Sequence, residues 1–170
     1  YDGGGLDLCY LGLAECDGHG NINVSRFGPR IAGCGGFINI TQNTHKVFFC
    51  GTFTAGGLKV KVEDGKVVIA QEGKQKKFLK DVEQITFNGD IALQNKQEVM
   101  YITERCVFQL KEDGMHLTEI APGIDLQTQI LDMMDFEPIV DRDANGEIKL
   151  MDAKLFAEGL MGLKEMKEGC

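Results

Sequence analysis

Apolar and polar positions alternate along the chain in short segments that turn residues separate. Leu6–Glu15 is a largely apolar run with little alternation, which predicts a strand buried on both faces. Asn21–Phe27 alternates like a second strand. Because the intervening Asp17–Gly20 carries a turn signal, the two segments together predict a hairpin.

The middle of the chain combines a helix with strands. A glycine-rich turn precedes a short helix expected over Ile38–Asn43 and an apolar strand expected over His45–Gly51. The order of strand, glycine turn, helix and strand is typical of an α/β protein. The clearest hairpin follows, in which Leu58–Glu63 and Lys66–Gln71 flank Asp64-Gly65.

The second half of the chain is richer in strands. Further extended segments are predicted at Val82–Phe87, Val99–Thr103, Arg105–Leu110 and His116–Ile120. Helices are expected over Asp125–Met134, with Asp125 as the N-cap, and over Met151–Met161. No repeat, low-complexity stretch or linker divides the chain, so we predict one α/β domain, with an open sheet and additional β-hairpins.

Composition narrows the classes of function. The 170 residues are 43% hydrophobic, which is enough for one core, and no apolar run reaches the roughly 18 residues of a membrane span. The formal net charge is −8 and the only compact basic run, Gly73–Lys77, lies in a predicted turn, so nucleic acid and membranes are not expected partners.

Six cysteines occur singly without a CxxC motif, which favours core thiols in a reducing, cytoplasmic setting. The chain begins at Tyr1 without a methionine or signal peptide, and we expect a fragment or processed product.

The glycine-rich turn Gly33–Phe37 (GCGGF) is the strongest candidate for chemistry. Its glycines permit positive φ angles and let a ligand approach bare backbone, and the start of the following helix would direct N–H groups outward. Such a turn can hold an anion. A tight structural turn explains the same residues. Cys34 lies within the turn and is either a reactive thiol or a packing residue.

Asp141–Asp152 fits the twelve-residue pattern of a calcium-binding loop. Asp141, Asp143, Asn145 and Asp152 occupy ligand positions, and Gly146 occupies the turn position. Against calcium, Pro138 interrupts the entering helix, Lys149 stands at position 9, and an aspartate replaces the bidentate glutamate at position 12. A polar surface turn is the alternative, and no metal ligand is assigned.

Three stretches taken together resemble the second half of a family I CoA-transferase, most closely the propionate or acetate/acetoacetate enzymes with fused halves. The first is Gly3–Asp7 followed by Leu11-Gly12, and the second is the Gly33–Phe37 turn. The third is Ile102–Phe108 (ITERCVF), followed by the segment 117–126 (LTEIAPGIDL). The set covers nearly the whole chain in the family's order, so residues 1–170 are identified as a C-terminal half-domain, truncated at its N-terminus.

The resemblance implies an open α/β sheet of the type shared with sugar-phosphate isomerases. It also implies ping-pong transfer of CoA between a short-chain acyl-CoA and a carboxylic acid, through a glutamyl-CoA thioester. CoA is then a substrate, and no permanently bound cofactor is expected. By this likeness Gly36 supplies an oxyanion-hole N–H, Gly33, Gly35 and Phe37 shape the backbone beside the thioester, and Asn23 contacts CoA through its side chain. A turn asparagine is the alternative for Asn23.

The family's nucleophilic glutamate has no counterpart in this chain. In the family it lies upstream of the first glycine-rich segment, and neither Glu15 nor Glu104 matches its motif. The isolated chain is therefore predicted to be inactive without the missing N-terminal half, which is its expected partner. A homo-oligomer is also expected, because an incomplete half-domain exposes apolar surface. The main alternative to the enzyme is a non-catalytic calcium-binding or scaffold domain that uses Asp141–Asp152.

Overall fold

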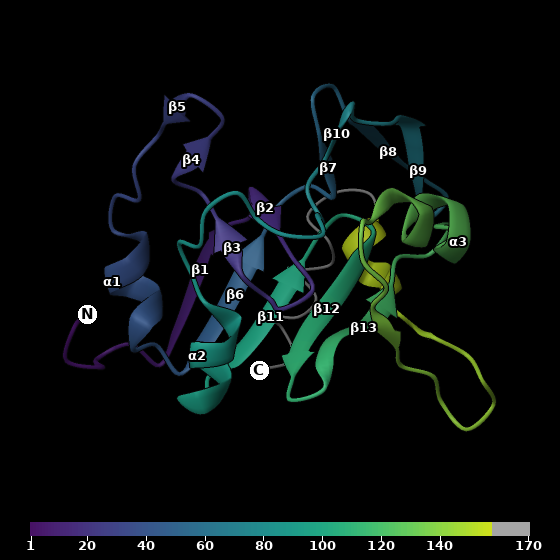
Figure 1. Ribbon diagram of the computed structural model, residues 1–170. Coiled ribbons are helices and arrows are strands. Elements are labelled where there is room, and N and C mark those ends of the chain that lie inside the picture. Colours follow the sequence, from purple (N-terminus) through teal and green to yellow (C-terminus); the bar gives the residue numbers. More distant parts are fainter. Residues whose placement is uncertain (158–170) are drawn as a thin grey trace.

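A seven-stranded mixed sheet organises the computed structural model, which describes residues 1–157 (Figure 1). Six strands follow one another in the order β1-β6-β11-β12-β13-β14, and β15 pairs with β13. Their bounds are Leu8–Gly12 (β1), Lys46–Cys50 (β6), Glu98–Ile102 (β11), Cys106–Lys111 (β12), Gly114–Ile120 (β13), Ile139–Val140 (β14) and Lys149–Leu150 (β15). Strands β1, β6 and β11 are parallel, whereas β12 runs antiparallel to β11 and to β13. The predicted open α/β sheet in one domain is confirmed.

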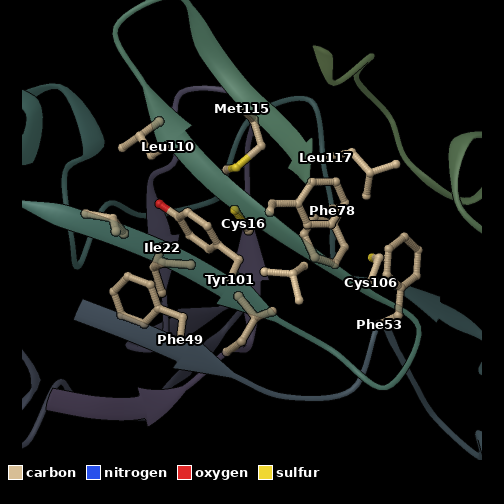
Figure 2. Close-up of a cluster of buried hydrophobic side chains, with 14 of the residues drawn as sticks. Cys16, Ile22, Phe49, Phe53, Phe78, Tyr101, Cys106, Leu110, Met115 and Leu117 are labelled. Carbon is tan, nitrogen blue, oxygen red and sulfur yellow. The ribbon is translucent and has the colours of Figure 1, made fainter. Parts of the chain in front are cut away.

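One face of the parallel strands forms the core. The row Cys9, Val47 and Val99 and the row Leu11, Phe49 and Tyr101 cross β1, β6 and β11 in register. All of these side chains except the partly buried Leu11 are buried. Figure 2 shows Phe49 and Tyr101 in this cluster, together with residues from β2, β12 and β13.

The opposite face of β1 is exposed. Leu8 and Tyr10 are 47% and 66% exposed, and Tyr10 stacks on Phe48 with ring centroids 4.9 Å apart. The prediction that Leu6–Glu15 is buried on both faces was therefore wrong. The reason is that, in the described residues, no element packs over Leu8 and Tyr10 on the face opposite the core.

Two helices lie toward the core face. Helix α1 (Phe37–Gln42) replaces the helix predicted at Ile38–Asn43, and its Phe37 stacks on Phe49 at 5.6 Å. Helix α2 (Gly89–Gln94) was not predicted, and it begins at the N-cap Asn88, whose side chain accepts a hydrogen bond from the Ile91 N–H. Within residues 1–157, no helix is long and apolar enough to cross a membrane.

Short hairpins surround the sheet. The hairpin predicted at residues 58–71 is confirmed as β8 (Lys59–Glu63) and β9 (Lys66–Gln71), with positive φ angles at Asp64 and Gly65. The turn predicted at Asp17–Gly20 joins two-residue strands, β2 (Glu15–Cys16) and β3 (Ile22–Asn23), because β1 itself belongs to the main sheet. The remaining pairs are β4 (Arg26–Phe27) with β5 (Arg30–Ile31) and β7 (Thr54–Ala55) with β10 (Gln75–Lys76).

Three predicted elements differ from the structure. Val82–Phe87 is not a strand. Its backbone pairs with a single residue of β3, Ile22, through Thr86 and Phe87, while the Val82 N–H donates to the Asp17 side chain. The helix expected at Asp125–Met134 keeps its N-cap but divides at the buried Ile130 into α3 (Leu126–Gln129) and the 3₁₀ helix η1 (Leu131–Met133). The last predicted helix is a 3₁₀ turn, η2 (Ala153–Phe156), and its expected continuation from residue 158 lies outside the described residues.

A buried arginine ties the β7–β10 region to the sheet. Arg105 is fully buried before β12, and its guanidinium pairs with both oxygens of Glu72 at 2.9 and 3.1 Å. Its Nε lies 2.7 Å from the Glu104 carboxylate, and its charge lies over the Phe53 ring, 4.7 Å from the centroid. The hydrogen bonds raise the pKa of Arg105 against the effect of burial, so the residue stays charged.

The cysteines follow the prediction only in part. Cys9, Cys16 and Cys106 are buried, Cys34 is partly buried, and Cys50 is exposed on the open face of the sheet. All five are unpaired thiols in the described part of the chain. Burial raises the pKa of Cys16 and Cys106, which keeps these two thiols protonated and unreactive.

Candidate functional site

The glycine-rich turn connects β5 to α1. Gly33 and Gly35 have φ angles of +79° and +52°, and a Cβ atom at either position would meet nothing within 4 Å. Backbone conformation, and not crowding, therefore requires glycine at these two positions. Gly36 is the N-cap of α1, with φ −86° and no side-chain cap.

Two adjacent N–H groups of the turn are available to a ligand. The Ala32 and Gly33 N–H groups both donate to the Ser25 carbonyl, and the Phe37 N–H donates to the Cys34 carbonyl. In the described part of the chain, neither the Gly35 nor the Gly36 N–H donates to a protein acceptor. Neighbouring backbone donors of this kind can stabilise an anion or a developing oxyanion.

Side chains of the turn hold it against the core. Phe37 is 7% exposed and stacks on Phe49, so its ring fixes the start of α1 and is not open to a ligand. Cys34 packs against the core cluster, which favours the packing interpretation of this thiol. The turn is thus anchored on one side and presents bare backbone on the other.

Asn23 stabilises the glycine turn through hydrogen bonds to the neighbouring backbone. Its Nδ2 donates to Glu15 Oε2 at 2.7 Å and to the Arg26 carbonyl at 2.6 Å, while its Oδ1 accepts from the N–H groups of Ser25 and Arg26. Both donors and both acceptor positions of the amide are therefore used within the protein. Because Asn23 is fully buried, the geometry favours the turn-asparagine alternative over a direct contact with CoA. Through Ser25, whose carbonyl receives the Gly33 N–H at 3.1 Å, Asn23 positions the glycine turn.

Ser25 and Thr86 are supporting residues that sequence reasoning missed. Ser25 Oγ lies 2.8 Å from Thr86 Oγ1, which also accepts the Val24 N–H at 3.2 Å. These contacts join segments about 60 residues apart, and no local pattern in the sequence marks them.

The two glutamates considered as nucleophiles are held in hydrogen bonds. Glu104 directs one oxygen to Arg105 Nε at 2.7 Å and accepts the Phe53 N–H on the other at 2.8 Å. Glu15 accepts from Asn23. A carboxylate bound to an arginine and a backbone N–H is a poor nucleophile, because attack would cost both interactions.

A cleft of about 300 Å³ lies beside α1. Ile38 and Thr41 of α1 line one wall, and Phe87 and Ile91 line the other. The lining of this mainly apolar cleft includes Ile38, which is two residues beyond Gly36, but no residue of the glycine turn itself.

The calcium-loop pattern does not assemble as a cation site. Asp141 binds Lys111 Nζ at 2.8 Å and His116 Nδ1 at 2.6 Å, so an ammonium group already neutralises it. Asp143 accepts the N–H groups of Asn145 and Glu147. Across residues 1–157, no three His, Cys, Asp or Glu side chains gather as metal ligands. The polar-turn alternative explains this segment.

Sequence comparison identifies relatives that are named as CoA-transferases. The chain is 56% identical over 162 residues to acetate CoA-transferase YdiF of Escherichia coli (strain K12), which covers 95% of this chain and 30% of that protein. The chain is a CoA-transferase homologue. It is also 54% identical over 168 residues to caffeate CoA-transferase of Acetobacterium woodii, covering 96% and 31% of the two chains. No protein-family model matches the chain.

Solved structures similar to this chain include a CoA-transferase of the same name. The thioester complex of acyl-CoA transferase YdiF from E. coli O157:H7 with CoA superposes with a TM-score of 0.89 at 56% identity, covering 94% of this chain and 30% of that chain. The decarboxylase AibA/AibB shares the fold alone, with a TM-score of 0.64 at 14% identity over 98% of this chain and 58% of its own. The CoA-transferase homologue thus spans about 30% of the curated relatives that it matches.

Proposed function

We propose that this chain is the C-terminal portion of a CoA-transferase that moves CoA from a short-chain acyl-CoA to a carboxylic acid. The observation that carries the proposal is the 56% identity to acetate CoA-transferase YdiF along 95% of the chain. The reaction is ping-pong, and its intermediate is a glutamyl-CoA thioester. CoA enters as a substrate, and the nucleophilic glutamate belongs to the part of the enzyme outside residues 1–170.

The Gly36 N–H is the proposed oxyanion donor of this reaction. Attack by the glutamate carboxylate on the thioester carbonyl converts its oxygen into an oxyanion, and CoA leaves as a thiolate to give an acyl-glutamyl anhydride. Attack by that thiolate on the glutamyl carbonyl of the anhydride creates a second oxyanion, which collapses to the glutamyl-CoA thioester and releases the original acyl group as a carboxylate. A donor that is already fixed in place lowers both barriers without reorganisation. Support comes from the contacts on either side of Gly36: the Gly33 N–H before it donates to the Ser25 carbonyl, and the Phe37 ring after it stacks on Phe49.

The first test uses the full-length protein. With acetyl-CoA and propionate, we expect propionyl-CoA to form. We further expect borohydride reduction of the acyl-CoA-treated enzyme, followed by peptide mass spectrometry, to find a reduced glutamate outside residues 1–170. Reduction at Glu15 or Glu104 would show that the nucleophile lies within this chain. Absence of transfer in the folded full-length protein would favour the non-catalytic scaffold.

The second test removes the Gly36 N–H alone. Gly36→Pro deletes the donor at a φ of −86°, which is close to the proline range, and Gly35 before it has no Cβ to clash with the proline ring. We expect kcat to fall by about 10²–10³-fold, as for loss of one oxyanion donor. Gly36→Ala keeps the N–H, and its Cβ would meet only Ile40 at 3.6 Å, so it should retain at least about tenfold more activity than the proline variant. Equal losses in both variants would argue against the donor role.

A further inference from the structure

Asparagine followed by glycine occurs twice in the chain, at Asn88-Gly89 and at Asn145-Gly146. This dipeptide can react without an enzyme, because glycine has no Cβ to keep its backbone nitrogen away from the asparagine side chain. The nitrogen bonds to the side-chain carbon Cγ, the bond from Cγ to Nδ2 breaks, and the proton of the attacking nitrogen passes through solvent to the departing amide, which leaves as ammonia. Water then opens the cyclic succinimide at either carbonyl, which gives aspartate or isoaspartate. The fold decides whether the two groups can meet.

The first dipeptide is held at the start of α2. Gly89 is buried, and its N–H donates to Asn21 Oδ1 at 3.0 Å. A Cβ atom built on Gly89 would lie 2.0 Å from the His19 carbonyl oxygen, so the backbone here is tightly packed. The Asn88 side chain accepts the Ile91 N–H at 2.9 Å as the N-cap. Attack on Asn88 would therefore break a buried hydrogen bond and a helix cap together.

The second dipeptide lies in the loop between β14 and β15. Residues 142–147 are exposed, and Figure 1 shows this yellow-green loop extending away from the sheet. The Gly146 N–H donates to the Asp143 carbonyl at 3.0 Å, within a single turn, and Asn145 Nδ2 makes only a long contact of 3.5 Å with Asp143 Oδ2. A Cβ atom built on Gly146 would meet no atom of the described residues within 4 Å. Attack on Asn145 therefore requires this turn to open, while β14 and β15 stay paired with β13.

We propose that Asn145 is a site of spontaneous deamidation in the folded full-length protein, and that the fold protects Asn88 from the same reaction. The modification is independent of the proposed CoA transfer. Its consequence is local: Asp143 Oδ1 accepts the N–H groups of Asn145 and Glu147, and a new carboxylate at residue 145 places a second negative charge in that turn. Isoaspartate also lengthens the backbone of the loop, because its Cβ becomes part of the main chain.

Isotope labelling tests the site in the folded protein. The full-length protein is aged below its thermal midpoint in mildly alkaline buffer made with oxygen-18 water, and is then digested in ordinary water. Only conversion that precedes digestion carries the heavy oxygen. Peptide mass spectrometry should find labelled aspartate and isoaspartate at residue 145, formed at least about tenfold faster than at residue 88, because Asn88 must first lose its cap and its neighbour's buried hydrogen bond.

Two controls separate the effect of the fold from that of the dipeptide. In urea, both asparagines should convert at similar rates, since the contacts that distinguish them are lost. Asn145→Gln keeps an amide but needs a larger ring to close, and should give no labelled product at residue 145. Equal conversion of the two sites in the folded protein would overturn the proposal, as would an Asn145 that converts as slowly as Asn88 until urea is added. The readout requires no transferase activity, so its failure leaves the proposed function in place.

Discussion

At the scale of single residues, Arg105 and Asn23 make several interactions that no local sequence pattern predicts. Arg105 stands in an apolar segment that predicts only a strand, yet its fully buried guanidinium joins Glu72, Glu104 and Phe53. Glu72 is 33 residues away in sequence, so no local spacing indicates the pair. Asn23 likewise makes four hydrogen bonds within the protein that no sequence pattern indicates, and its contact with CoA stays a prediction.

Arg105→Met in the full-length protein is expected to lower the free energy of unfolding by about 3–5 kcal/mol, because it leaves two partly buried carboxylates unpaired. Urea denaturation measures the change. Lys46→Met is the matched control: its pair with Glu98 has side chains 53% and 41% exposed and should contribute no more than about 1 kcal/mol. A comparable loss in both variants would contradict the structural role of Arg105.

At the scale of elements, capping residues explain what the hydrophobic pattern misses. Helix α2 has six residues, which are too few to show helical periodicity. The only local signal for its start is the N-cap residue Asn88. Helix α3 shows the converse, because Asp125 caps it as predicted while the buried Ile130 interrupts it. Burial of one side chain therefore decides where a short helix ends.

Asn88→Ala should destabilise the full-length protein by about 1 kcal/mol, since the Ile91 N–H loses its side-chain acceptor. Asn88→Asp keeps the acceptor oxygen and should stay within a few tenths of a kcal/mol of the unaltered protein. The thermal midpoint of unfolding gives the comparison. If the alanine variant melts with the aspartate variant, the cap does not stabilise α2.

At the scale of the whole molecule, ion pairs join regions distant in sequence, and they make stability depend on pH. Partial burial opposes the charge on Glu72, but hydrogen bonds from Arg105, Thr54 and Gly73 outweigh it and lower the pKa of Glu72. Hydrogen bonds from Lys111 and then His116 likewise lower the pKa of Asp141, which links β14 to the β12–β13 hairpin.

Because the folded-state pKa of Glu72 lies below its ordinary value of 4.5, its contribution to stability is complete above about pH 4.5. It is lost as the pH falls through the lowered folded-state pKa. Glu72→Gln should therefore lower the thermal midpoint at pH 7 and lose this disadvantage progressively toward pH 3. Thermal melts of both proteins across this range test the expectation, and a difference independent of pH would contradict it.

The sequence by itself determined the local features whose causes lie within a few residues. These are the α/β class, the β8–β9 hairpin with its Asp64-Gly65 turn, the Asp125 cap, and the existence of the glycine turn. It also carried the family resemblance, which identity to known CoA-transferases then supported.

Only the tertiary structure decided which groups are occupied by partners. Glu15, Glu104 and Asn23 are all held in contacts within the protein. In the described residues, the Gly35 and Gly36 N–H groups stay without a protein acceptor, and β1 lies at an edge of the main sheet. The physical reason is that hydrogen-bond satisfaction and burial depend on residues distant in the chain. A strand's own pattern shows that it has two faces and two edges, but not which of them the rest of the protein covers.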